Sequence, residues 1–346
     1  MSLNLLTEYL RFFWISCVVL CTSVSCQRAP SPQNPFSISL DDLKLDGKEL
    51  THSEYVEIQK RIQSIDITEI LKDKYTDCQE KDFTHFQDFW NRCTKSLRQI
   101  LIDPEKGHFP QKKLIQIGKG GDRCVVCAGS FNGKYPSYID ALQKGLQETN
   151  FNGHLLYYIG GWPNPTGQEI RFVSVPYCFK VFAMVEAKQL GFNQVLWVDS
   201  ACYPLRNIEP LFEIIERDGA LLNWSRPKKS WRFIFPSTVD ALKQITGVNV
   251  IRTKFINSIV MGLKMDTPQA EKFVKKYYEM AELGFPFLSC YPEEFVFTSI
   301  INDGNYPSWV AHKPPKLIKS SLALDSPEEA ENQRKQGIFF YHRKER

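Results

Sequence analysis

The sequence shows little charge imbalance and few residues of the kinds that mark specialised binding classes. Lys and Arg number 43 against 39 Asp and Glu, which leaves a formal net charge of +4 over 346 residues. No run of Lys and Arg has the density of a nucleic-acid binder, which argues against a nucleic-acid partner. Only 6 histidines are present, and no group of His and Cys has zinc-ligand spacing. With 43% hydrophobic and 13% aromatic residues, the composition is typical of a globular protein rather than a disordered or fibrous one.

The amino-terminal segment lacks an uncharged run long enough to cross a membrane. Residues 12–24, after Arg11, are uncharged but cover only about thirteen residues, whereas a membrane-spanning helix needs roughly 20. This length suits the core of a signal peptide, and small residues precede Cys26. We therefore expect residues 1–26 to be a signal peptide or signal anchor, and the protein to be exported or membrane-anchored. A buried amino-terminal helix is the alternative.

Cysteine is present in larger number, but it does not define the compartment. Three of the 10 cysteines lie in the amino-terminal segment and the others are scattered. Cys124 and Cys127 have the spacing of a redox or zinc pair, yet they lie in an apolar run typical of a strand. Residues three apart in a strand point to opposite faces, so we interpret this run as a buried strand.

Composition divides the remaining chain into a linker, a helical extension, a main domain and a tail. Residues 27–50 contain Pro and Ser with little periodicity, which is typical of a linker. Thr51 and Glu54 form a predicted capping box, and a second helix is expected over residues 83–102. We therefore predict a helical extension over residues 51–120, the main domain over 121–320, and a polar tail over 321–346.

Short apolar runs alternate with helical segments throughout the main domain. The expected strands cover residues 124–128, 153–159, 195–198, 220–224, 257–265 and 309–312. The expected helices cover residues 136–148, 176–190, 208–217, 267–283 and 293–301. This alternation predicts an α/β sandwich with a mainly parallel central sheet.

One of these apolar runs ends in a carboxylate. Val195-Leu-Trp-Val198 has the composition of a central parallel strand buried on both faces, and it stops at Asp199. Ligands of such sheets bind just beyond the carboxyl ends of the strands, which makes Asp199 a candidate binding residue. The alternative is an Asp that caps the turn or helix that follows.

Two other segments have features suited to an anionic ligand. The glycine-bearing turn 129–134 leads into a helix whose amino-terminal end could bind a phosphate, although it lacks the full dinucleotide fingerprint and could be an ordinary loop. Segment 225–235 interleaves basic and aromatic residues, which suits a loop over an anionic ligand or a solvated loop. Its basic residues are Arg226, Lys228, Lys229 and Arg232.

Several of these features together resemble the GT-A type of nucleotide-sugar glycosyltransferase. The resemblance rests on Pro176-Tyr-Cys-Phe-Lys180, Gly191, the strand that ends at Asp199, and Leu211-Phe212, and it covers about residues 123–312. It implies a Rossmann-like α/β/α sandwich that binds a nucleoside diphosphate sugar. The donor-binding residues implied by the resemblance are Ser130, Phe131, Lys134, Lys180, Asp199, Ser200, Arg226, Lys228 and Lys229.

The chain departs from this family at one position that matters. The family's Asp-x-Asp element has a second Asp where this sequence has Ala201. Mg²⁺ and Mn²⁺ prefer several oxygen ligands, so a metal site here is weakened. Basic side chains, Lys180 and the loop 225–235, could stabilise the diphosphate instead. As in some relatives, His312 could join Asp199 as a metal ligand; a hydrogen-bonded surface His is the alternative.

The resemblance implies a glycosyltransferase that moves a sugar from the donor to an acceptor hydroxyl of a glycan, protein or lipid. Glu293 or Glu294 would act as general base, or both could be acidic residues that favour a helix amino terminus. The alternative is a non-catalytic nucleotide-sugar or glycan-binding protein on the same fold, which Ala201 favours.

Overall fold

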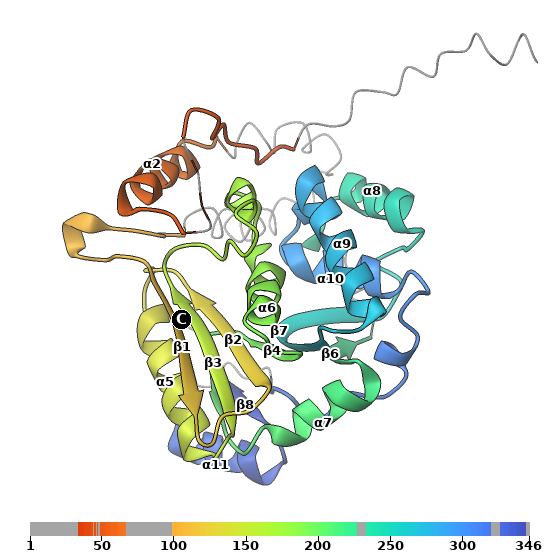
Figure 1. Ribbon diagram of the computed structural model, residues 1–346. Helices are drawn as coiled ribbons and strands as arrows, with labels where there is room; N and C mark the ends of the chain where they lie inside the picture. Colours follow the sequence, from red (N-terminus) through yellow and green to blue (C-terminus); the bar gives the residue numbers. More distant parts are fainter. Residues whose placement is uncertain are drawn as a thin grey trace, which may run out of the picture. The chain divides into compact units, whose positions relative to one another are not determined.

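The computed structural model describes residues 34–43, 45, 47, 49–66, 99–226, 233–319 and 326–343. Its centre is a six-stranded sheet in the order β1-β3-β2-β4-β7-β6 (Figure 1). The strands of this sheet are β1 Gln111–Ile117, β2 Arg123–Gly129, β3 Gly153–Ile159, β4 Gln194–Val198, β6 Ala220–Ser225 and β7 Phe255–Lys264. A separate two-stranded sheet pairs β5, Cys202–Pro204, with β8, Phe340–His342.

Helices surround the sheet, and their order along the chain follows the predicted alternation. The α-helices are α2 His52–Gln63, α5 Tyr135–Glu148, α6 Phe179–Gln189, α7 Glu209–Asp218, α8 Pro236–Thr246, α9 Pro268–Leu283, α10 Pro292–Ile301 and α11 Pro327–Lys335. Short 3₁₀ segments are η2 Pro104–Lys106, η3 Glu169–Phe172, η5 Phe285–Phe287 and η6 Ser308–Val310. Within the described ranges, no helix combines the length and apolar character needed to cross a membrane.

The sheet is mainly parallel, as expected from the alternation of strands and helices. The neighbours β3, β2 and β4 are parallel to one another. β6 shares their direction, because both β4 and β6 pair antiparallel with β7. β1 also runs opposite to this set, antiparallel to β3 at the edge of the sheet. The carboxyl ends of β2, β3, β4 and β6 therefore lie at one common edge of the sheet.

The buried strands separate two hydrophobic clusters, one on each face of the sheet. In β4, Leu196 and Val198 pack on the side of α5 and α7. Val195 and Trp197 point to the opposite face, toward α6, α9 and α10. This alternation confirms the prediction of a central strand buried on both sides.

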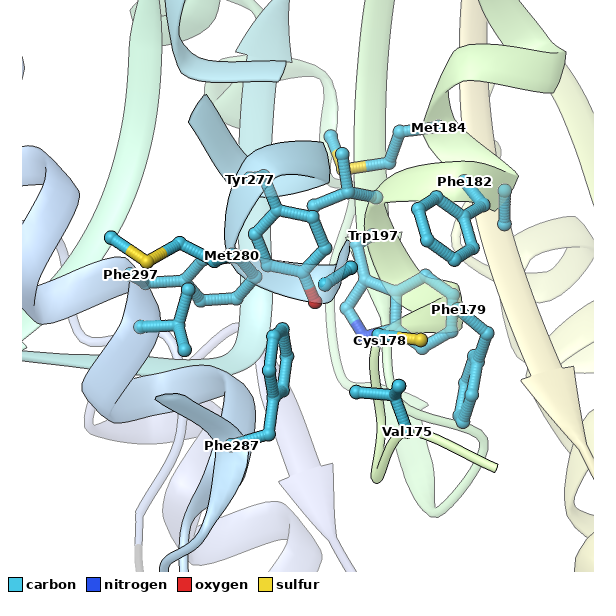
Figure 2. Close-up of a cluster of buried hydrophobic side chains, with 14 of the residues drawn as sticks. Val175, Cys178, Phe179, Phe182, Met184, Trp197, Tyr277, Met280, Phe287 and Phe297 are labelled. Atoms are coloured by element: carbon cyan, nitrogen blue, oxygen red, sulfur yellow. The ribbon is translucent and has the colours of Figure 1, made fainter. Parts of the chain in front are cut away.

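Aromatic side chains fill the second of these clusters. Phe182 of α6, Tyr277 of α9 and Phe297 of α10 are fully buried there together with Trp197 (Figure 2). Figure 2 shows the Tyr277 ring at the centre of the cluster, with its hydroxyl oxygen among apolar neighbours. This packing holds α6 against β4 and α10 against β7, and these four elements position the residues of the candidate site.

Several predicted helix starts are confirmed by the observed capping contacts. Thr51 and Glu54 form the capping box of α2. The side chain of Thr267 accepts a hydrogen bond from the backbone N–H of Ala270, with Pro268 as the first residue of α9. These contacts satisfy N–H groups that the helix itself leaves free, so they locate a helix start from sequence alone.

Other predictions were wrong. Residues 309–312 do not form a strand, because Ser308–Val310 is a 3₁₀ turn that buries Trp309 against Phe273. The helix expected from residue 176 begins at Phe179 instead. Strand β1 and helix α8 were not predicted; the outer edge strand is largely exposed, so it shows no apolar run. Most of the expected helix 83–102 lies outside the described residues.

The segments on either side of the main domain pack against it. Phe36 is buried, and the Ser174 hydroxyl donates a hydrogen bond to its carbonyl. At the other end, Phe340 is fully buried in β8, next to β5. The predicted domain boundaries remain predictions, but parts of the segments 27–50 and 321–346 contribute to the core.

Candidate functional site

A buried lysine joins three elements at the centre of the candidate site. Lys180 lies in the first turn of α6, and its side chain is only 4% exposed. Its Nζ lies 2.9 Å from Oδ1 of Asp199, directly after β4, and 2.8 Å from Oε1 of Glu293 in α10. Two carboxylates that are far apart in the sequence thus share one ammonium group.

Strand β7 supplies the remaining contacts of this ammonium. Lys180 Nζ donates to Ser258 Oγ at 3.0 Å and lies 3.4 Å from the Ser258 carbonyl oxygen. The same hydroxyl donates to Oε1 of Glu293 at 2.7 Å. An ammonium has three N–H donors, so protein atoms already satisfy all of them.

The charge of Lys180 is stabilised by its neighbours. Burial alone lowers the pKa of the ammonium, but the charges of Asp199 and Glu293 and their hydrogen bonds outweigh it. The pKa of Lys180 is therefore raised above its ordinary value, and the group stays protonated at neutral pH.

Asp199 is held in one orientation at the end of β4. Its Oδ1 accepts from Lys180 and also from the indole N–H of Trp197, at 2.7 Å. Its backbone N–H donates to the Ile259 carbonyl of β7 at 2.9 Å. The Asp199 side chain is 28% exposed, and Oδ2 accepts no hydrogen bond from the described residues. One oxygen of this carboxylate is fixed by the protein, and the other can accept a hydrogen bond from a ligand.

Glu293 and Glu294 open α10, as the sequence predicted, and both contact β7. Glu294 Oε1 accepts from Asn257 Nδ2 at 2.7 Å and from the backbone N–H of Ser258 at 3.1 Å. Both side chains are buried. Asp199 and Glu293 bond to the single ammonium of Lys180, and Glu294 adds a third carboxylate beside Ser258, so the acidic groups outnumber the basic one. We call Lys180, Asp199, Ser258, Glu293 and Glu294 the acid cluster.

The turn 129–134 lies at the same edge of the sheet as the acid cluster. β2 and β4 are parallel neighbours, and Val126 pairs with Trp197. Extending this register places Gly129 roughly 6 Å from Asp199, given strand spacing of about 4.8 Å and a rise of about 3.3 Å per residue. Within the turn, Ser130 Oγ donates to Asn132 Oδ1 at 2.6 Å. The sequence-based expectation that the turn and Asp199 lie together agrees with this geometry.

The other predicted donor-binding residues differ in their surroundings, and two of them lie outside the described residues. Phe131 stacks on His108, with ring centroids 4.8 Å apart, and Ser200 is buried. Lys134 precedes α5 and is exposed. Arg226 is exposed just after β6, a strand parallel to β4. Lys228 and Lys229 lie outside the described residues.

The described residues do not fit a divalent metal ion. They contain no group of three or more His, Cys, Asp and Glu side chains placed to hold one. Oδ1 of Asp199 is already bonded to Lys180, and Ala201 offers no side-chain oxygen. His312 is exposed, and its carbonyl accepts from the Trp224 indole at 3.2 Å. The suggested metal ligand pair of Asp199 and His312 therefore has no third ligand among the described side chains.

Three residues near Lys180 were not among the site residues predicted from the sequence. Trp197 donates to Asp199, Ser258 bonds to Lys180, and the Tyr177 ring lies 6.0 Å from Lys180 Nζ. Trp197 and Ser258 lie in strands that were predicted, but a strand pattern does not reveal which partner each side chain meets. Tyr177 was expected inside the helix 176–190, but it precedes the observed start of α6 at Phe179 by two residues, and no sequence signal marks that position.

A separate cavity of about 600 Å³ lies between α6 and α9. Its floor is largely apolar, with Val185, Val274 and Tyr278 among the lining residues. No member of the acid cluster lines it.

Comparisons with known proteins give a distant structural likeness and no match at the sequence level. No protein family model matches the chain, and no curated protein sequence matches it. Among solved structures, the apo form of mouse xyloside xylosyltransferase 1 is similar over 66% of this chain and 98% of its own, with 12% sequence identity and a TM-score of 0.38.

Proposed function

We propose that this protein is a glycosyltransferase that moves a sugar from a nucleoside diphosphate donor to a hydroxyl of a glycan, protein or lipid. The observation that carries the proposal is the shared ammonium of Lys180, which binds Asp199 and Glu293 together at the carboxyl edge of the parallel strands. That edge is where α/β sheets bind their ligands, and the turn 129–134 lies beside it. The sequence resemblance supports the same activity.

The contacts suggest a division of roles within the acid cluster. Asp199 binds a hydroxyl of the donor through Oδ2, since Oδ1 is held by Lys180 and Trp197. The ammonium of Lys180 is fully bonded within the protein, so we propose that it positions the two carboxylates. The sequence-based assignment of Lys180 to the diphosphate stays a prediction.

We propose Glu293 rather than Glu294 as the general base. Glu293 uses Oε1 for both Lys180 and Ser258, and its Oε2 accepts no hydrogen bond within the described part of the chain. Glu294 bonds to Asn257 and to the Ser258 backbone, which fits a structural role at the start of α10. A general base must reach the acceptor hydroxyl at roughly 2.6 to 3.2 Å. The first turn of α10 faces the same site as Asp199.

In this proposal the basic side chains of the loop 225–235 neutralise the negative charge of the diphosphate. Arg226 begins this loop at the end of β6, a strand that ends at the same edge as β4. Cationic groups at a fixed position stabilise the developing charge of a leaving group without a metal ion. We further propose that residues 1–26 direct export or membrane attachment, where acceptor glycans, proteins and lipids occur.

The proposal is tested by ligand-dependent stability and by turnover in the full-length protein. Purified protein is screened for thermal stabilisation by UDP, GDP and their sugar conjugates, since a ligand of the native state raises stability. Hydrolysis of the same donors is then measured for the wild type, Asp199→Asn and Glu293→Gln. We expect binding in all three proteins, with turnover reduced at least a hundredfold in Glu293→Gln.

Two results would contradict the proposal. Failure of every donor and every nucleoside diphosphate to stabilise the protein would exclude a nucleotide-sugar enzyme. Tight binding without turnover by the wild type, with any acceptor or with water, would favour the non-catalytic binding protein, for which the missing second Asp at Ala201 is the supporting observation.

A further inference from the structure

Tyr177 has a backbone conformation that is unusual for its residue type. Its φ angle is 57°, in the left-handed region. Among the described non-glycine residues only Asn150, with a φ of 54°, shares this feature. Asn tolerates the left-handed region because its short side chain bonds locally, whereas the Cβ of a tyrosine crowds the backbone there. Strained residues of this kind persist where the surrounding structure holds them, often at binding sites.

The side chain of Tyr177 lies against the acid cluster. Its ring centroid is 6.0 Å from Lys180 Nζ and 6.2 Å from the ring of Phe179. Burial raises the pKa of the phenol, and the charge of Glu293 and the nearby phenol of Tyr135 raise it further. Tyr135 is the first residue of α5, directly after the turn 129–134. Tyr177 therefore faces both parts of the proposed site.

The hydroxyl of Tyr177 is not used within the described structure. It makes no hydrogen bond to any described residue, and the side chain is partly exposed. Buried tyrosines such as Tyr158, which donates to Glu186 at 2.6 Å, and Tyr277 lie inside the core, whereas Tyr177 is partly exposed at the edge of the acid cluster. A partly exposed ring with an unbonded hydroxyl beside two carboxylates is instead suited to contact a ligand.

We propose that Tyr177 is a specificity-determining residue whose ring forms the platform for the sugar ring of the donor. This inference rests on the proposed function. A pyranose has one apolar face of C–H groups and a rim of hydroxyls. The aromatic face of Tyr177 packs against the C–H groups, while Asp199 and Glu293 accept hydrogen bonds from the hydroxyls. The strained backbone before α6 holds the ring at the position where these contacts converge.

The test compares the sugar-bearing donor with the same nucleotide lacking the sugar. UDP-glucose, UDP-galactose, UDP-xylose, UDP-N-acetylglucosamine and GDP-mannose are titrated by calorimetry against the full-length protein, together with UDP and GDP. The variants are Tyr177→Phe, Tyr177→Ala and Tyr177→Asn. Tyr203→Ala is the matched control, because Tyr203 is also partly exposed but bonds its hydroxyl to Glu148 at 2.5 Å.

We expect loss of the ring to weaken binding of the sugar-bearing donor about tenfold, with binding of the free nucleoside diphosphate unchanged. Tyr177→Phe keeps the ring and should remain within about threefold of the wild type. Tyr203→Ala should bind both ligands like the wild type. Thermal unfolding adds a readout of strain: Tyr177→Asn should be at least as stable as Tyr177→Ala, because Asn tolerates this φ angle.

Three outcomes would overturn the inference. Equal weakening of donor and nucleoside diphosphate in Tyr177→Ala would place the ring at the nucleobase or indicate a structural role. Unchanged binding of both ligands would remove Tyr177 from the site while leaving the proposed function intact. If the wild type binds none of the nucleotides, the proposed function fails, and the platform inference fails with it.

Discussion

The indole N–H of Trp197 donates a hydrogen bond to Oδ1 of Asp199 at 2.7 Å. Trp197 lies near the end of β4, and Asp199 directly follows that strand. Side chains two apart in a strand point to the same face, which is the face that α6 covers. Trp197 is 1% exposed, so this hydrogen bond forms in the core and orients the carboxylate at the sheet edge. The hydrophobic core thus fixes the conformation of the candidate ligand-binding residue.

We predict that Trp197→Phe weakens donor binding and turnover by about tenfold or more, because a hydrogen bond to a charged group contributes roughly 1.5 to 3 kcal/mol. Trp162→Phe is the control: Trp162 is 5% exposed and donates to the Glu169 carbonyl at 2.9 Å, outside the acid cluster. Isothermal titration with the donor, beside urea unfolding, separates the two effects. Equal loss of affinity in both variants would show that Trp197 acts only through stability.

We predict that Lys180→Met lowers the free energy of unfolding by about 3 to 5 kcal/mol at pH 7, because it leaves the buried carboxylate of Glu293 and the partly exposed carboxylate of Asp199 without their cation. The double variant Lys180→Met with Glu293→Gln should recover part of this loss. Urea unfolding at pH 7 measures both. A variant as stable as the wild type would mean that the buried pair contributes nothing to stability.

The pH dependence of that contribution has a defined sign. The pKa of Lys180 in the folded protein is raised above its ordinary value of 10.5. The ion pairs therefore contribute fully below pH 10.5 and are lost only as the pH rises toward the folded pKa. We expect the difference in unfolding free energy between wild type and Lys180→Met to be constant from pH 7 to 9 and to shrink above 10.5. A difference that disappears below pH 9 would contradict the raised pKa.

Two buried tyrosines should respond in opposite ways to loss of their hydroxyl. Tyr277 is fully buried, and its Oη has no hydrogen-bond partner among the described residues. Tyr158 is 3% exposed and donates to Glu186 at 2.6 Å. We predict that Tyr277→Phe raises the free energy of unfolding by about 1 kcal/mol, and that Tyr158→Phe lowers it by about 1.5 to 3 kcal/mol. Loss of stability in both variants would indicate a partner for the Tyr277 hydroxyl.

We predict that transfer or donor hydrolysis depends only weakly on divalent metal, because Ala201 provides no oxygen ligand. EDTA should change the rate little, whereas replacing Arg226, Lys228 and Lys229 together by Ala should lower it about a hundredfold, roughly 3 kcal/mol. Rates with and without EDTA and added Mn²⁺ measure both effects. Activity abolished by EDTA and restored by Mn²⁺ would assign a metal site to Asp199 and His312.

We predict that removal of residues 1–26 leaves a folded, soluble protein. The described chain begins at Asn34, whose side chain donates to the Ala281 carbonyl in α9 at 3.3 Å, so the truncation ends before this contact. Gel filtration and thermal unfolding of the truncated and full-length proteins measure the effect. If the truncated protein aggregates while the full chain is soluble without detergent, the signal interpretation is wrong.

The sequence alone determined those strands and helix starts that a short stretch of neighbouring residues specifies. The apolar run before Asp199 predicted β4, and Thr267 with Pro268 predicted the start of α9. These signals arise because a doubly buried strand must be apolar throughout, and because the first N–H groups of a helix need an acceptor. Position at the end of β4 also predicted that Asp199 lies at the ligand-binding edge of the sheet.

Only the tertiary structure decided which carboxylates share the ammonium of Lys180, and which residue has a strained backbone. Lys180, Ser258 and Glu293 come from three separate elements, and no spacing in the sequence links them. The left-handed backbone of Tyr177 likewise has no local signal, because tyrosine has no preference for that region. Such features depend on how α6, β7 and α10 pack around Trp197, and packing of distant segments is set by the whole core rather than by neighbouring residues.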